Sequence, residues 1–325
     1  MKLTTLRPLA AILLACTLTA CAPASSPSNS TGHSSSPSSS SSQAQSVTFT
    51  DDLGRTVTVE RPERVAALIG SFADIWCLAG GQSTLVATAN DAWTSFDLGL
   101  DDSVLDLGGV KEPNFEILLS AQPDLVLASC NTTANVDMRS SLEQANIPVA
   151  YFDIQHFSDY LRMLEICTQL TGCPERYTQY GEDVGKVIDQ AIARQDGSAP
   201  TVLCMRTTGS SCKVKGSQDF LLGEMLADLG CVNVADQDSA LLEDLSLEAI
   251  MAADPDYIFV VLQGSDPTNA QETLERTLLS NPAWGSLRAV QENRFYTLDH
   301  ALYNLKPNAR WGEAYEKLAD ILYPQ

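Results

Sequence analysis

Basic residues are scarce in this chain of 325 residues. Twenty lysines and arginines stand against 41 aspartates and glutamates, which gives a formal net charge of −21. Without residues 1–20, which hold Lys2 and Arg7, the remainder has 18 basic and 41 acidic residues and a net charge of −23. A surface this acidic repels polyanions, so nucleic acid is not an expected partner.

The chain also lacks the short motifs on which common enzyme classes depend. It contains no GxSxG nucleophile elbow, no HExxH zinc-binding helix and no Walker A loop. Cys130 or Cys212 could act as a nucleophile beside a histidine, but nothing in the spacing of these residues supports that role. The sequence therefore predicts a protein that is not an enzyme, with an enzyme kept as an alternative.

Cysteine pairs spaced for zinc binding or disulfide exchange are missing too. Cys16 and Cys21 lie near the N-terminus, which leaves seven of the nine cysteines in the body, and no two are spaced as CxxC. Several lie in apolar runs such as IWCLAG and VLCM, which is typical of small buried residues. An odd number leaves at least one unpaired. The seven are Cys77, Cys130, Cys167, Cys173, Cys204, Cys212 and Cys231.

The first 20 residues are apolar but too short to span a bilayer. The apolar run covers residues 9–20, whereas a spanning helix needs roughly 20 residues. The run ends in LTA directly before Cys21, and small residues before a cysteine resemble a lipoprotein signal. We therefore expect residues 1–20 to be a signal peptide and Cys21 to be lipidated on the extracytoplasmic face of the cell membrane. The alternative is an ordinary secretory signal with an incidental cysteine.

Charged residues are absent from residues 22–46, where 13 of 25 residues are serine. Such a segment cannot bury enough apolar surface to offset its ordering entropy, so it predicts a disordered tether behind the lipidated cysteine. Its end-to-end distance would be about 25–30 Å. His33 lies in this tether and has no expected role.

Alternating apolar strands and amphipathic helices fill the rest of the chain. Buried strands at RVAALIG, TLVATA, LVLAS and PVAYFD alternate with helices, and the rhythm restarts at TVLCMRT. This order is typical of parallel sheets with helices on both faces. An apolar stripe predicts one helix over residues 174–196, roughly 30 Å long. The predicted fold is α/β, with two Rossmann-like lobes over residues 47–173 and 197–325 joined by that single long helix.

One segment occurs twice, which supports two lobes of related design. NFEILLSAQPDLVLA over residues 114–128 aligns with SLEAIMAADPDYIFV over residues 246–260. A constant offset of 132 residues separates three identical pairs: Glu116 and Glu248, Pro123 and Pro255, Asp124 and Asp256. Each lobe therefore carries one glutamate near the start of an equivalent helix.

Four stretches carry a family resemblance: DDLGRTVTVERPERVAAL (51–68), LGGVKEPNFEILLSAQPDLVLAS (107–129), the repeat at 246–260, and NPAWGSLRAVQENRFYTLD (281–299). With the lipoprotein signal, they resemble the substrate-binding lipoproteins of ABC importers for ferric siderophores, haem and cobalamin. The resemblance implies a ligand in a cleft between the lobes and limited closure. It also implies that Glu116 and Glu248 pair with arginines on a permease dimer, which works with a cytoplasmic ATPase.

Ligand contacts are expected where strands end, because open α/β sheets bind ligands at the carboxyl ends of their strands. Arginine forks and aromatic faces suit anionic, oxygen-rich ferric siderophores, and Arg206 is the strongest basic candidate. The candidates are Ser71, Phe72, Trp93, Lys111, Asn131 and His156 in the first lobe and Arg206, Lys213, His300, Tyr303 and Arg310 in the second.

His156 and His300 follow equivalent strands and could face one another to ligate a metal or haem iron. The alternative is that each histidine bonds a carbonyl at a sheet edge. A zinc or manganese importer component would want three histidines and a carboxylate, and the body has two histidines. We therefore expect no resident metal or cofactor. Siderophore, haem and cobalamin all stay open as ligands, and a ligand sensor without a transport role is a further alternative.

Overall fold

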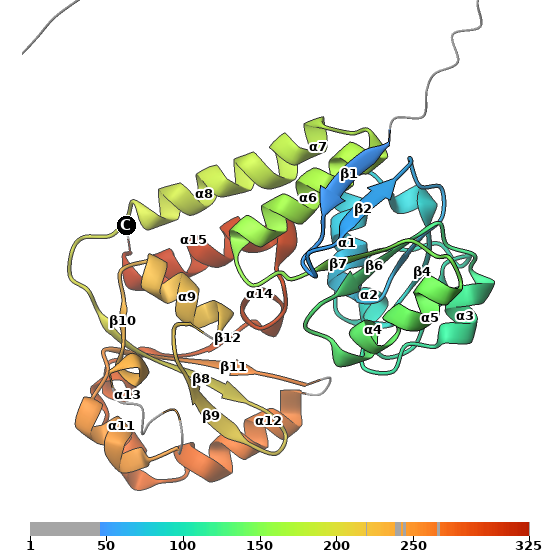
Figure 1. Ribbon diagram of the computed structural model, residues 1–325. Coiled ribbons are helices and arrows are strands. Elements are labelled where there is room, and N and C mark those ends of the chain that lie inside the picture. Colours follow the sequence, from blue (N-terminus) through green and yellow to red (C-terminus); the bar gives the residue numbers. More distant parts are fainter. Residues whose placement is uncertain (1–45, 219, 238–241, 243–244, 265–266, 325) are drawn as a thin grey trace, which may run out of the picture. The chain divides into compact units, whose positions relative to one another are not determined.

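The alternating apolar segments form two separate five-stranded sheets in the computed structural model (Figure 1). The structure describes residues 46–218, 220–237, 242, 245–264 and 267–324. The predicted signal peptide, Cys21 and the tether up to residue 45 lie outside these residues. By its contacts, the chain from Ala44 to Gln325 forms one compact unit.

The first sheet is parallel, as predicted, with the strand order β5-β4-β3-β6-β7. An antiparallel hairpin of β1 (Val47–Thr50) and β2 (Thr56–Val59) precedes it. Its strands are β3 (Val65–Ala67), β4 (Leu85–Thr88), β5 (Leu105–Asp106), β6 (Leu125–Ser129) and β7 (Val149–Phe152). Its helices are α1 (Gly70–Leu78), α2 (Asp91–Thr94), α3 (Phe115–Ser120), α4 (Thr133–Asp137), α5 (Arg139–Gln144) and α6 (Phe157–Thr171).

The second sheet has the order β10-β8-β11-β12, with β9 also paired to β8. Its strands are β8 (Thr201–Thr207), β9 (Cys212–Lys215), β10 (Val232–Asn233), β11 (Tyr257–Leu262) and β12 (Phe295–Leu298). Its helices include α9 (Leu221–Asp228), α11 (Leu247–Ala253), α12 (Pro267–Leu274), α13 (Arg288–Gln291), α14 (His300–Tyr303) and α15 (Trp311–Leu322).

The expectation of parallel sheets is wrong for β9. This strand runs antiparallel to β8, with Thr207 opposite Cys212. The turn between them is closed by a bond from the Thr208 N–H to the Ser211 carbonyl oxygen, 2.8 Å long. A connection this short permits only an antiparallel neighbour, since parallel strands need a long crossover.

The predicted helix between the lobes is present but is shorter and not uniform. It consists of α7 (Glu175–Tyr177), a π-helical turn over Thr178–Glu182 and α8 (Asp183–Ile192). Gly181 in the π turn lies against α6, where an added Cβ would be 2.9 Å from Leu161. The extra residue of a π turn changes the local winding of a helix, and here it coincides with this close approach.

The repeated segment keeps its backbone conformation as well as its sequence. Asn114 and Ser246 cap α3 and α11 at matched positions. Gln122 and Asp254, also 132 residues apart, both have a positive φ, of 47° and 37°. Non-glycine residues rarely adopt this conformation, so its recurrence at matched sites supports a duplication of the whole helix–strand unit.

A continuous apolar core connects the two sheets. One cluster of buried side chains takes Leu125 and Phe152 from the first sheet and Cys204 and Phe259 from the second. Two further clusters lie on the opposite faces, one behind each sheet. Helices therefore cover both faces of both sheets, as expected.

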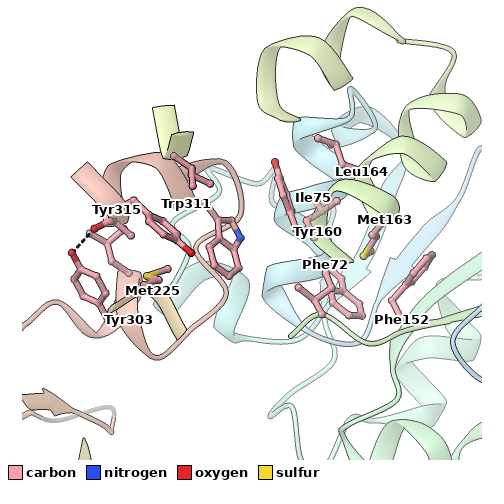
Figure 2. Close-up of a cluster of buried hydrophobic side chains, with 14 of the residues drawn as sticks. Phe72, Ile75, Phe152, Tyr160, Met163, Leu164, Met225, Tyr303, Trp311 and Tyr315 are labelled. Atoms are coloured by element: carbon pink, nitrogen blue, oxygen red, sulfur yellow. Dashed lines mark hydrogen bonds between the residues drawn. The ribbon is translucent and has the colours of Figure 1, made fainter. Parts of the chain in front are cut away.

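Trp311 lies in this shared core at the start of α15, and Figure 2 shows it among the aromatic side chains of α6 and α15. Its ring packs edge-on against Phe157, with the ring centroids 5.8 Å apart. The next residue, Gly312, touches α8, where an added Cβ would be 2.9 Å from Val187. Helices α8 and α15 lie side by side through this contact (Figure 1).

Trp311→Ala should lower the free energy of unfolding by about 3–5 kcal/mol, because it leaves a cavity where the two halves of the core meet. Urea denaturation followed by circular dichroism measures this change. Trp93→Ala, at a half-buried position on α2, is the matched control and should cost less. Equal losses for the two variants would contradict a central role for Trp311.

Candidate functional site

A cavity of about 330 Å³ opens at the carboxyl ends of the strands of the first sheet. This is where the strand order reverses around β3, the usual ligand position in open α/β sheets. Every strand from β3 to β7 sends lining residues from the segment that follows it. From this half of the chain the lining residues are Ile69, Ser71, Phe72, Asp91, Phe96, Val110, Ser129, Asn131, Thr132, Ile154 and Gln155.

The wall of the cavity at α1 is held by a close backbone contact. The Asp91 Oδ1 atom accepts a 2.8 Å bond from the Gly70 N–H. An added Cβ at Gly70 would lie 2.5 Å from the backbone nitrogen of Ala92, so glycine is required for this approach. Burial raises the pKa of Asp91 above its usual range, although the bond from Gly70 opposes this. Ser71 and Phe72 are positioned directly after this contact.

The opposite wall carries amide side chains held by Asp153. Asn131 donates to Asp153 Oδ1, and Gln155 Nε2 donates to the same oxygen over 2.9 Å. Each amide still has donor and acceptor capacity free for a ligand.

A third wall comes from the other end of the chain. Asn304, Leu305 and Lys306, which follow α14, line the same cavity. Burial lowers the pKa of Lys306 below its usual range, although Asp153, Asp159 and Glu224 oppose this. Sequence reasoning named the flanking residues Tyr303 and Arg310 but missed this segment. The sequence could have indicated this segment, because residues 304–306 come shortly after β12, the last strand of the second sheet along the chain.

Two further cavities adjoin the first. One, of about 340 Å³, shares Val110, Asn131 and Thr132 with it and adds the exposed Lys111. The other, of about 170 Å³, shares Phe96 and Lys306 and reaches Arg310. Arg310 already pairs with Glu313 at 2.6 Å, and this bond lowers the pKa of Glu313 to about 2. Lys111 is therefore the more available of the two cations.

Arg206 and Lys213 form a pair of like charges on the second sheet. They are direct partners in the antiparallel register of β8 and β9, so their side chains leave the same face. Arg206 shares that face with Cys204, whose side chain belongs to the core that joins the two sheets. Like charges directly opposite one another are unfavourable, and a bound anion would relieve this repulsion. Sequence reasoning proposed both residues but could not place them together, because it missed β9.

The two histidines of the body have different environments. The His156 Nδ1 atom lies 2.6 Å from Glu224 Oε1 on α9, which links the first half of the chain to the second. Burial raises the pKa of Glu224, although the bond with His156 opposes this. His300 begins α14, and burial lowers its pKa although Asp299 opposes this. No cluster of three or more metal-ligating side chains occurs among the described residues.

Two other proposed contact residues lie in the core. Trp93 is half-buried and packs against the shared core. Tyr303 is buried, and its hydroxyl donates to the Ala314 carbonyl oxygen over 3.0 Å (Figure 2). Neither lines a cavity described above. All seven body cysteines are free, and Cys167, Cys204, Cys212 and Cys231 are buried. The burial predicted from apolar runs is confirmed for Cys204 in VLCM, whereas Cys77 in IWCLAG is half-buried.

Part of the uncompensated positive charge of the chain lies at the cavities. In the described part of the chain, five lysines and arginines make neither an ion pair nor a hydrogen bond: Arg61, Lys111, Arg206, Lys213 and Lys306. Lys111 and Lys306 line the cavities, and Arg206 and Lys213 share one face of the second sheet. In a chain with twice as many acids as bases, two unpaired cations at adjoining cavities favour an anionic ligand.

A larger open hollow, of about 740 Å³, lies beside α9. It is lined by Glu224, Asp228 and Asp236 against the single cation Lys215. This surplus of carboxylates would repel an anionic ligand, so the hollow is less suited to an anion than the cavity at Lys306.

Glu116 and Glu248 occupy the second position of α3 and α11, respectively. Both side chains are exposed, and neither makes an ion pair with another described residue. A carboxylate in the first turn of a helix is favourable in its own right, because it lies near the positive end of the helix dipole.

Comparison with known proteins matches residues 65–302 to the periplasmic binding protein family. The iron-uptake system-binding protein of Bacillus subtilis is 27% identical over 67% of this chain and 67% of its own length. The Fe(3+)-citrate-binding protein YfmC of the same organism is 26% identical over 77% of each chain. The high-affinity heme uptake system protein IsdE of Staphylococcus aureus is 23% identical, covering 68% of this chain and 75% of IsdE.

Solved structures share the fold at low identity. The siderophore-binding protein BauB, solved with acinetobactin and ferric iron, superposes with a TM-score of 0.69 at 19% identity, covering 85% of this chain and 99% of BauB. The heme-binding protein RhuT of Roseiflexus gives a TM-score of 0.65 at 22% identity, covering 80% of this chain and 98% of RhuT.

Proposed function

The chain belongs to the periplasmic binding protein family, and on that premise we propose that it captures an iron complex and delivers it to an ABC permease. The ligand is a ferric siderophore or haem, with a cobalamin-like ligand as the alternative. The observation that carries the proposal is the cavity at the strand ends, with the unpaired cation Lys306 in its wall and Lys111 in the adjoining cavity. Relatives named for iron uptake, ferric citrate and heme support the same ligand class.

The ligand contacts proposed here combine the three walls. Ser71, Phe72 and Asn131 would contact the ligand in the cavity, and Lys111 would contact the part that extends into the adjoining cavity. Arg206 and Lys213 would approach an anionic group from the second sheet. Haem ligation by His156 and His300 has less support, because His156 is engaged by Glu224.

Docking to the permease is assigned to Glu116 and Glu248. Their matched positions on duplicated helices suit a permease built from two equal subunits, with one basic socket for each glutamate. The relative YhfQ of B. subtilis is named as a putative ABC transporter substrate-binding lipoprotein, which supports this partnership.

Lipid attachment at Cys21 would hold the protein at the membrane. Among the described residues, no helix is both long and apolar enough to cross a bilayer. A sensor that reports ligand occupancy to a membrane partner would use the same body, and the docking test below separates the two roles. An enzyme has the least support, because the relatives are named as binding and uptake proteins.

Cys21→Ala should release the protein from the membrane fraction, since the apolar run before it is too short to anchor the chain. Fractionation of cells followed by immunoblotting measures this. Cys16→Ala, within the predicted signal peptide, is the matched control and should leave the distribution unchanged. Continued membrane association of Cys21→Ala would rule out the lipid anchor.

Arg206→Ala should weaken binding of an anionic ferric chelate by about 1.5–3 kcal/mol, the range for a hydrogen bond to a charged group. Isothermal titration calorimetry on the purified body measures the dissociation constant. Arg61→Ala, an exposed cation that lines none of the cavities described, is the control. Unchanged affinity in Arg206→Ala would remove this residue from the site.

The double variant Glu116→Ala with Glu248→Ala should abolish docking and transport and leave ligand affinity within about twofold, because neither glutamate touches the ligand in this model. Each single variant should lose part of the docking. Uptake of the labelled ligand by cells and co-purification with the permease measure the two effects. Normal uptake by the double variant, or loss of the ligand itself, would contradict the docking role.

A further inference from the structure

Lys306 is a cation from the last third of the chain that lies in a cavity built mainly by the first sheet. It lines both the central cavity and the smaller one beside it. Among the described residues no carboxylate is close enough to form an ion pair with it. Asp153, Asp159 and Glu224 act on it only across a longer distance. The ammonium group is therefore partly desolvated and has no partner of its own.

The backbone next to Lys306 is anchored to the first half of the chain. Asn308 is fully buried, and its Nδ2 atom donates to the Ser71 carbonyl oxygen over 2.9 Å and to Asp74 Oδ2 over 2.8 Å. Its φ of 51° lies in the left-handed region, which asparagine tolerates better than most residues. Two hydrogen bonds and a left-handed backbone conformation thus fix the position of Asn308, which is two residues after Lys306 in the chain.

The cavity lining includes one carboxylate, Asp91, whose Oδ1 atom accepts a bond from the Gly70 N–H and which makes no ion pair with Lys306. The neutral groups of the lining can complete a site for a carboxylate of a ligand. Hydroxyl and amide groups from Ser71, Ser129, Thr132 and Asn304 face the same space and can donate hydrogen bonds. A desolvated cation is costly unless it is paired. A carboxylate that enters the cavity would pair with the ammonium group of Lys306 and accept hydrogen bonds from the neutral donors.

We propose that Lys306, positioned by Asn308, is the specificity-determining residue that binds a carboxylate of the ligand. This deepens the proposed function and rests on it. A carboxylate can come from two kinds of iron complex, a ferric polycarboxylate or the propionates of haem. A neutral corrinoid has no such group and would leave Lys306 unpaired.

The test compares Lys306→Met, which keeps the length of the side chain and removes its charge, with Lys306→Arg, which keeps the charge. Dissociation constants for ferric citrate and for haemin are measured by tryptophan fluorescence and calorimetry on the purified body. Lys306→Met should bind the carboxylate ligand about 10- to 100-fold more weakly, and Lys306→Arg should stay within about tenfold of the wild type. Arg61→Met, which removes an exposed cation that lines none of the cavities described, is the control and should change the constant by less than about threefold.

A second comparison uses the unaltered protein and so does not depend on the folding of any variant. Haemin and its dimethyl ester share one macrocycle, and the ester has no free carboxylate. Weaker binding of the ester identifies haem as the source of the carboxylate. Binding of ferric citrate together with loss in Lys306→Met identifies a ferric polycarboxylate instead.

The outcomes separate this proposal from the function on which it rests. Wild-type affinity in Lys306→Met, or equal binding of haemin and its ester when haemin is the only ligand bound, would overturn the role of Lys306. Binding of cyanocobalamin alone would overturn it too and would leave the binding-protein function intact. Failure to bind ferric citrate, ferric siderophores, haemin or cyanocobalamin would overturn both.

Discussion

The structure depends on one continuous apolar core that the two sheets share. The sheets do not contact one another through strands, so α6, α8, α9 and α15 must fill the space between them, and Trp311 lies where their side chains meet. Because protein interiors are close-packed, a core of this kind resists large changes in the relation between its parts. The cavity walls are therefore largely preformed, which lowers the ordering cost of binding. The family resemblance also implies limited closure, which stays a prediction for this chain.

Charge distribution sets the second constraint on function. A net charge of −21 disfavours the approach of an anion at long range, although screening limits this to about 8 Å at physiological salt. For the anionic ligand that we propose, binding would then depend on local cations that the protein's own carboxylates do not neutralise. Arg206 and Lys213 meet this condition on one sheet face, and Lys306 meets it inside the cavity. An acidic surface and local unpaired cations can therefore coexist in this chain. An anion would be repelled by most of the surface and attracted where those cations lie.

The duplication links the fold to the proposed partner. Asp124 accepts bonds from the backbone N–H groups of Glu63 and Arg64, and Asp256 accepts from the N–H of Thr201. In each half, the repeated aspartate before one strand thus binds the start of a neighbouring strand. The repeated aspartate therefore has a structural role. The repeated glutamates are exposed and have no internal ion-pair partner. Their place in the first turn is favoured by the helix dipole, and the docking proposal adds a role for their exposed carboxylates.

The sequence by itself determined most of the order of strands and helices, with the exception of β9, together with the two sheets and the duplicated unit. These follow from hydrophobic periodicity and from local turn and cap residues, which act over a few neighbours. Several proposed contacts, including Ser71, Phe72 and Asn131, could be placed at the cavity because strand ends are visible in the sequence. Only the tertiary structure decided that Arg206 faces Lys213, that Glu224 engages His156, and that Lys306 lines a cavity built from residues more than 150 positions earlier. Those relations depend on strand pairing and packing between distant segments, and no local pattern in the chain encodes them.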